Sequence, residues 1–273
     1  MKKIRLLIIV SLIALAITSC KEDEAVVTTN INAKWNVSAT TSPYKSFEFT
    51  ESGNYLVTTN AGTKSTDQDI YIFGSYSAVA QTLKLKDFGT IEINELTSNN
   101  VSFTLKLDSA SADPIEITAT KADEMDSDTK TDLLCRSWDM YKINGKTAEG
   151  TSAEATVFFS KAGTYFIEFK YPDEIHESGM ALWKWSDSNQ TKFCYSWGET
   201  ITCDENNQVE VVEVTQSSLK LQQIFSSDEG GDDEYDVYEL TLADNNKSAS
   251  VNTTIINQNS GLNKSGFLYR QKK

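Results

Sequence analysis

The feature that most constrains the fold of this chain is an internal repeat. Three segments recur in the same order, and their apolar positions stay in phase between the two copies. The matched pairs are Trp35 with Trp138, residues 47–55 with 157–165, and residues 91–97 with 209–215. The last match continues without a gap to Val101 and Leu219. A shift of one residue exchanges the two faces of a strand, so the shared phase predicts a duplicated domain.

Each copy has the pattern of short β-strands. In the first copy Phe47 and Phe49 share one side of a strand, residues 52–54 turn, and Tyr55 and Val57 carry the return strand. Similar runs, separated by turn residues, predict eight strands between residues 30 and 121. The chain has only three prolines and is rich in Thr, Ser, Val, Tyr and Phe, a composition typical of strands.

The second copy also predicts eight strands, which fixes a domain plan. They lie at about residues 136–142, 154–160, 163–170, 179–186, 191–197, 208–214, 218–225 and 236–243. We therefore predict one β-domain at 30–121, a polar linker at 122–131 and a second β-domain at 132–243. Residues 244–273 have no counterpart in the first copy, and we expect either an added hairpin or a loose tail there.

Eight consecutive strands, a tryptophan near the first strand and a Gly-x-Tyr hairpin at 53–55 and 163–165 resemble the lipocalin-like domains of Bacteroidota lipoproteins. The resemblance covers both repeats. It implies an all-β chain with two tandem small eight-stranded up-and-down barrels. A barrel of this size is either filled by its own side chains or holds one small ligand. Bulky inward candidates such as Trp35, Phe103 and Trp138 favour filled barrels.

The N-terminal segment predicts export. Three basic side chains at residues 2–5 precede an apolar run at 6–17 and small residues at 18–19, which is the layout of a secretory signal peptide. A membrane span needs about 20 apolar residues, and the run is shorter than that.

Residues 17–20, Ile-Thr-Ser-Cys, resemble the lipobox of bacterial lipoproteins, and the acidic residues 22–24 resemble the surface-export signal of Bacteroidota lipoproteins. The resemblance implies a signal peptide at 1–19, a lipid anchor on Cys20 that binds the membrane, and a tether at 20–29. It also implies an outer-membrane location at the cell surface. Acidic residues are also common in a plain solvated tether, so the alternative is that residues 22–24 carry no export signal.

The net charge of the chain argues against a nucleic-acid partner. The formal net charge is −14, and because nucleic-acid binding needs basic surface, we expect no nucleic-acid partner.

Export permits a disulfide, and Cys194 and Cys203 lie on either side of Gly198, where a bend would bring them together. Sequence alone does not fix the pairing. With Cys135 included, the spacing lacks the short paired intervals of zinc ligands, so we predict no metal site.

The sequence offers little for catalysis. A catalytic triad needs a nucleophile, a base and an orienting acid together, and the single histidine, His176, lies in a polar segment. The acidic residues 227–236 surround two glycines, and this pattern favours a solvated hairpin tip over a calcium site. We therefore expect a non-catalytic protein without a cofactor.

Aromatic residues mark the most suggestive part of the second domain. They alternate along two predicted strands that form one hairpin: Trp183, Trp185, Phe193, Tyr195 and Trp197. Rings that face inward would be core or pocket lining, and rings that face outward would form a platform for sugars or a partner. The first domain has smaller residues in its corresponding hairpin, for example Ser75 and Leu83. The pattern favours binding of a small apolar molecule or a glycan through domain 2. The alternative is an accessory subunit of an outer-membrane protein complex, with filled barrels.

Overall fold

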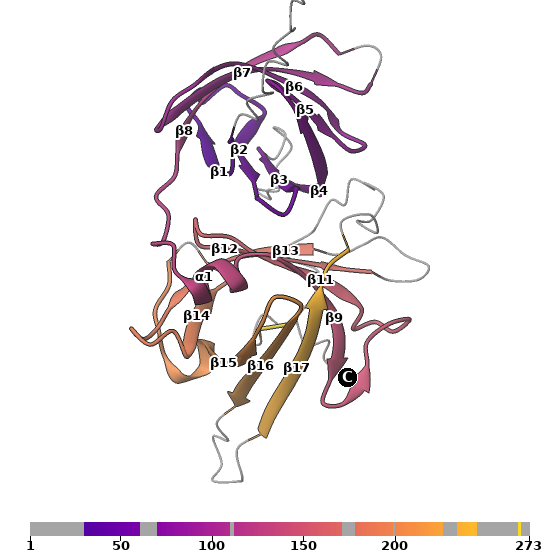
Figure 1. Cartoon of the computed structure of the whole chain (residues 1–273), viewed down its shortest axis with the longest axis vertical. Coiled ribbons are helices and arrows are strands. Elements are labelled where there is room, and N and C mark those ends of the chain that lie inside the picture. Colours follow the sequence, from indigo (N-terminus) through magenta and orange to yellow (C-terminus); the bar gives the residue numbers. More distant parts are fainter. Residues whose placement is uncertain are drawn as a thin grey trace, which may run out of the picture.

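The computed structural model describes residues 30–60, 70–109, 112–170, 178–198, 200–225, 234–244 and 267–268. These residues form two closed antiparallel barrels of eight strands, one above the other in Figure 1. Each strand pairs with the next strand of its own barrel, so both barrels are up-and-down. The predicted all-β fold of two tandem eight-stranded barrels is confirmed. Within the described residues, no helix has the length and apolar character that a membrane crossing requires.

Barrel 1 is built from the first copy of the repeat. Its strands are β1 (Ala33–Val37), β2 (Tyr44–Phe49), β3 (Asn54–Thr59), β4 (Ile70–Val79), β5 (Thr82–Leu85), β6 (Gly89–Leu96), β7 (Asn100–Leu107) and β8 (Ile115–Lys121). Strand β8 returns to pair with β1 and closes the barrel. The inward rows bury large side chains such as Trp35, Phe47 and Phe103, because residues two apart in a strand share one face.

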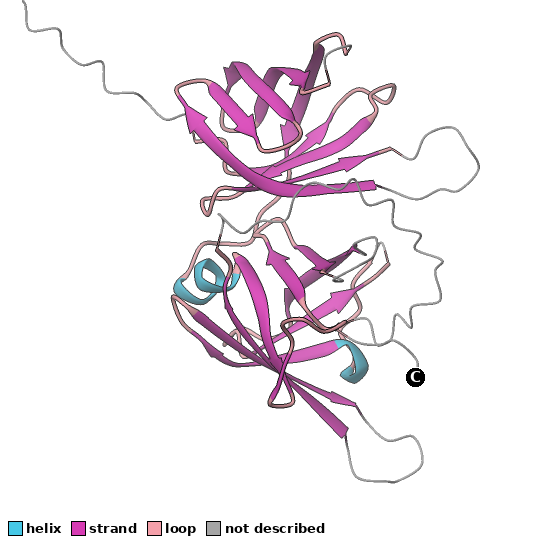
Figure 2. Cartoon of the chain, turned by 90° about the vertical axis from the view of Figure 1, so that its right-hand side faces the viewer, coloured by secondary structure: helices cyan, strands magenta, loops and turns pink. Residues whose placement is uncertain are grey.

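Barrel 2 repeats this plan with a short helix in front of it. Its elements are α1 (Thr129–Leu134), β9 (Ser137–Ile143), β10 (Lys146–Thr147), β11 (Ala155–Phe159), β12 (Thr164–Phe169), β13 (Ser178–Trp185), β14 (Lys192–Ser196), the 3₁₀ turn η1 (Glu205–Asn207), β15 (Gln208–Val214), β16 (Ser218–Phe225) and β17 (Glu234–Leu242). Strand β17 pairs with β9 and closes the barrel, and the two-residue strand β10 is an extra partner of β9. Figure 2 shows both helical segments at the periphery of this barrel.

The two copies share details of hydrogen bonding as well as strand order. The indole Nε1 of Trp35 donates to the carbonyl of Ile31 at 2.8 Å, and that of Trp138 donates to the carbonyl of Leu134 at 3.0 Å. In both barrels the tryptophan therefore fixes the chain four residues before it, where that chain enters the barrel.

The turns and bulges of the two copies also coincide. Gly53 and Gly163 both have positive φ, 79° and 76°, a conformation that glycine adopts without a steric penalty. The strand pairs β6–β7 and β15–β16 both shift register, at Ile93/Glu95 and at Val211/Glu213. The bulges fall on matched positions of the repeat, so the same local geometry forms twice.

The barrels pack against each other through equivalent strands. The outer face of β3 and β4 meets the outer face of β11–β13, and Figure 1 shows β3 and β4 next to β12 and β13 between the two barrels. The shared apolar cluster consists of Leu56, Tyr71 and Phe73 from barrel 1 and Phe158, Phe166 and Met180 from barrel 2. The ring centroids of Phe73 and Phe166 are 5.2 Å apart. Aromatic contacts of this kind stabilise the interface by about 0.5–1.5 kcal/mol beyond the stabilisation from the apolar area that they bury.

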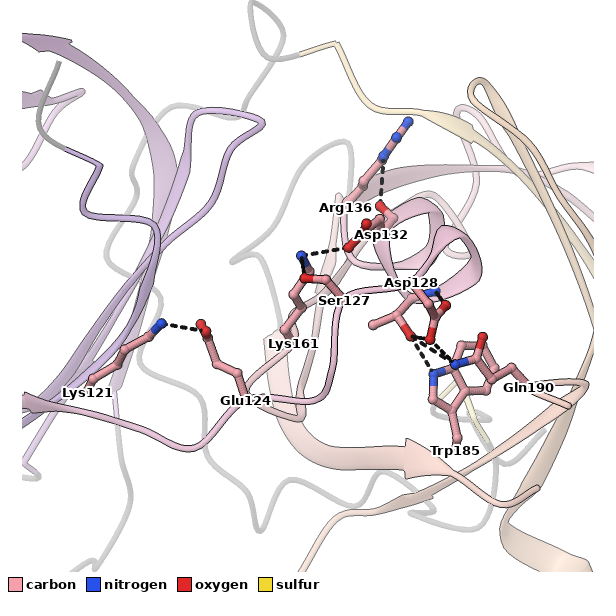
Figure 3. Close-up of polar contacts among 10 residues, drawn as sticks. Lys121, Glu124, Ser127, Asp128, Asp132, Arg136, Lys161, Trp185 and Gln190 are labelled. Atoms are coloured by element: carbon pink, nitrogen blue, oxygen red, sulfur yellow. Dashed lines mark hydrogen bonds and ion pairs between the residues drawn. The ribbon is translucent and has the colours of Figure 1, made fainter. Parts of the chain in front are cut away.

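The connection between the barrels is ordered by side-chain contacts. The predicted linker, residues 122–131, runs into helix α1, whose N-cap is Asp128, and the Asp128 carboxylate accepts from the backbone N–H of Thr131 at 2.9 Å. A side-chain acceptor at this position satisfies an otherwise unpaired helix N–H group. The indole of Trp185 donates to the Thr131 hydroxyl at 3.0 Å, and Gln190 bonds to Asp128 (Figure 3). Helix α1 is thereby held against barrel 2.

Candidate binding site in the second barrel

The aromatic residues singled out in domain 2 lie on the inside of barrel 2. Trp183, Phe193 and Tyr195 belong to its buried core, and Trp185 and Trp197 pack against that core. Their rings contact one another, with centroids 5.4 Å apart for Trp183 and Trp185 and 6.3 Å apart for Tyr195 and Trp197. The hairpin of β13 and β14 therefore presents its aromatic face inward.

A ring from beyond the last strand occupies the middle of this barrel. Phe267 is 0% exposed, and its ring stacks on that of Tyr165 with centroids 4.8 Å apart and planes 12° apart. The other neighbouring rings belong to Phe159, Phe193, Tyr195 and Tyr238, at centroid distances of 5.5–6.2 Å. The neighbours come from β11, β12, β14 and β17, so the ring is surrounded by the barrel wall.

The backbone of Phe267 is also bound inside the barrel, through two hydrogen bonds. Its N–H donates to the amide oxygen Oε1 of Gln223 at 2.8 Å, and its carbonyl accepts from the hydroxyl of Tyr165 at 2.8 Å. Gln223 is itself oriented, because its Nε2 donates to the Tyr195 hydroxyl at 2.8 Å. The N–H and the carbonyl belong to two successive peptide groups, and each needs its own partner when it is buried, since leaving one hydrogen bond unmade costs about 1–3 kcal/mol.

Sequence reasoning missed Gln223 as a site residue, although the repeat contains a signal for it. The register that joins Val101 to Leu219 continues to Leu105 and Gln223. Both residues are fully buried, yet the first barrel has a leucine where the second has an amide. The polar side chain appears in the barrel whose interior holds a peptide group.

In barrel 1 the tyrosine that matches Tyr165 has different partners. The hydroxyl of Tyr55, which matches Tyr165 in the repeat, donates to the carbonyl of Lys86 at 2.9 Å, and the Tyr55 ring stacks on Phe88 with centroids 6.1 Å apart. Lys86 and Phe88 lie in the turn between β5 and β6. In barrel 1 the tyrosine therefore bonds to a turn of its own barrel, whereas in barrel 2 it bonds to residue 267.

One wall of barrel 2 is held by a disulfide. Cys194 on β14 is bonded to Cys203, with Cα atoms 5.4 Å apart. This is the pair that the sequence proposed and could not fix. The neighbouring residue Tyr195 is buried, and burial, partly offset by the hydrogen bond from Gln223, raises its pKa to about 12. Tyr195 is therefore neutral near pH 7 and serves as a hydrogen-bonding group.

A hollow lies between the barrels. This interdomain cleft of about 250 Å³ is lined by residues of β1, β2, the linker and the β11–β12 turn. Lys161, from that turn, pairs with Asp132 at 2.6 Å and donates to Ser127 at 2.8 Å, as Figure 3 shows. The cleft also touches the free thiol of Cys135. Burial raises the pKa of this thiol, so it stays protonated and unreactive.

Glu48 in the cleft wall is the most unusual polar residue of the interface. It is 2% exposed, and neither carboxylate oxygen has a hydrogen-bond partner in the part of the chain that the structure describes. Lys34 lies directly opposite on β1, but its ammonium donates to Thr164 of barrel 2 at 3.0 Å. The matched residue of the second copy, Phe158, is part of the apolar interface cluster.

Several other predictions from the sequence concern residues outside the described ranges. Cys20, His176 and residues 227–233 lie outside the described residues. Among the residues that are described, no group of three His, Cys, Asp or Glu side chains is placed to hold a metal ion. Neither a protein-family model nor a curated protein matches the chain.

Proposed function

We propose that this protein is a non-catalytic lipoprotein of the Bacteroidota outer membrane that binds a small apolar molecule in barrel 2. The lipobox-like residues 17–20 and the acidic residues 22–24 support the anchor on Cys20 and a position at the cell surface. The all-β architecture agrees with the lipocalin-like resemblance.

The observation that carries the binding proposal is the position of Phe267. This side chain does not belong to any of the eight barrel strands, yet its ring stacks on that of Tyr165 and lies nearly parallel to that of Phe159 inside the barrel. An eight-stranded barrel is wide enough for one small ligand, and barrel 2 accepts a six-membered ring from outside its own wall. The inward rings favour an apolar molecule over a glycan, because stacking on a sugar needs an exposed aromatic face.

A second candidate function is that of an accessory subunit in an outer-membrane protein complex. The close packing of Trp183, Trp185 and Phe193 against one another favours it. In this alternative, Phe267 completes the core of a filled barrel and the outer surfaces carry the function. The two candidates place the functional contact on opposite sides of the barrel wall.

Native mass spectrometry of the protein, gently extracted from the membranes of its host, tests the proposal. We expect a small-molecule adduct whose occupancy rises in Phe267→Asp, since a charge cannot be buried in the apolar interior and residue 267 then leaves the site. Tyr235→Asp, at an exposed position on β17, is the matched control. A stoichiometric protein partner without an adduct in either variant would favour the accessory subunit.

A further inference from the structure

Within the proposed binding function, on which this inference rests, the polar contacts inside barrel 2 define the class of ligand. We propose that barrel 2 recognises an aromatic ring flanked by an amide N–H and an amide carbonyl, as in a phenylalanine residue of a peptide or a peptide-like small molecule. The site is now occupied by the chain's own Phe267.

The contacts to the two flanking amide groups are both made. Gln223 accepts the N–H of residue 267 and Tyr165 donates to the carbonyl of the same residue, both at 2.8 Å. The two contacts come from β16 and β12, on different parts of the barrel wall. A ligand must therefore present one donor and one acceptor with the spacing that a single amino-acid residue provides. A purely apolar molecule would not replace these two hydrogen bonds to Gln223 and Tyr165.

The geometry for the ring is equally specific. The Phe267 ring is nearly parallel to those of Tyr165 and Phe159, at 12° to each. It meets Tyr195 at 73°, edge to face. Stacked and edge-to-face contacts are the favourable arrangements of aromatic rings, so a planar ring suits this site better than a branched aliphatic group.

The repeat supplies an internal comparison. At the position of Gln223 barrel 1 has Leu105, and the tyrosine that matches Tyr165 donates to the carbonyl of Lys86 within its own barrel. Barrel 1 thus keeps the tyrosine but lacks the amide acceptor. The pair of Tyr165 and Gln223 distinguishes a barrel that holds a peptide group from one that does not.

The test uses the full chain with Phe267→Asp, which vacates the site, and two probes. N-acetyl-L-phenylalaninamide offers the ring with the N–H and carbonyl of Phe267, and toluene offers the ring alone. Binding is measured by isothermal titration calorimetry or by ligand-observed NMR. We expect the amide probe to bind Phe267→Asp about tenfold or more tightly than the wild type, where Phe267 competes from within the same molecule.

The control variant is Phe267→Asp/Gln223→Leu, which installs the side chain of barrel 1. It should weaken the amide probe by about 10- to 100-fold, because a buried N–H loses its acceptor, and leave toluene binding unchanged. If toluene binds and the amide probe gains nothing from Gln223, the ligand class is wrong while the binding function stands. If neither probe binds a folded Phe267→Asp protein, both proposals fail.

Circular dichroism and a cooperative melt establish that each variant is folded. Should Phe267→Asp not fold, the wild type supplies the decision. A high concentration of the amide probe should displace Phe267 and move its ring resonances towards random-coil values. Unchanged resonances at millimolar concentrations of the probe would overturn the inference, since the effective concentration of a group tethered within the same molecule is of about that order.

Discussion

Replacing Glu48 by leucine should stabilise the protein. The Glu48 carboxylate lies in the interface between the barrels, is 2% exposed and has no hydrogen-bond partner among the described residues. A buried polar group without a partner costs about 1–3 kcal/mol, and more if it is charged. Leucine has a similar volume and would face Leu56 across β2 and β3. We therefore expect the free energy of unfolding to rise by about 1–3 kcal/mol.

The assay is thermal unfolding followed by circular dichroism. For a protein of this size, about 1 kcal/mol corresponds to a shift of 2–4 °C in Tm, so the predicted gain is about 2–12 °C. Glu92→Leu is the matched control, because Glu92 lies in the same barrel in an exposed pair with Lys106; surface changes of this kind stay within about 0.5 kcal/mol. A loss of stability in Glu48→Leu would mean that the carboxylate has stabilising partners and would refute the reasoning.

Three further changes test other parts of the structure. Cys203→Ser opens the disulfide to Cys194 and should lower the free energy of unfolding by about 2–3 kcal/mol in urea titrations; equal midpoints would contradict this. The pKa of Tyr195 is raised to about 12 by burial, above its unfolded value near 10, so the stability that its neutral form confers is complete below pH 10 and lost as the pH rises towards 12. Tyr195→Phe should remove this part of alkaline unfolding, and an unchanged profile would count against it. Cys20→Ala should release the protein from membranes, and retention in the membrane fraction would exclude the anchor.

Much of the fold follows from local pattern in the chain. Alternating residues such as Phe47 and Phe49, or Phe193 and Tyr195, face inward as their period predicts, because the pleat places alternate side chains on one face. The turn at Gly163 follows from the need for positive φ there. The phase shared by the two copies then carries each assignment from one barrel to the other.

The interface between the barrels could not be predicted in this way. Alternation places Glu48 and Phe158 on the outer face of their strands, and pattern alone assigns an outer face to solvent. Their burial arises only when the two outer faces meet, which depends on how the linker directs barrel 2. Pattern in a single strand does not contain that information.

The occupant of barrel 2 lay beyond sequence reasoning for a related reason. The hydrogen bond from Tyr165 to residue 267 spans 102 positions, and residues 267–268 form no strand of either barrel. Gln223 is the one local clue, because an amide on an inward-facing row of a strand requires a polar partner inside the barrel. In this barrel Gln223, in the same inward row as Leu219 and Leu221, marks the place where the backbone of residue 267 is bound.

Hydrogen exchange of the Phe267 amide in the intact protein tests most directly whether barrel 2 takes in a peptide group from outside its own strands. Because this N–H donates to the fully buried Gln223, we expect its exchange to be slowed by about 100-fold or more, to a level approaching that of amides in β12 and β16. Exchange at the rate of an unstructured peptide would place Phe267 outside the barrel and contradict the account.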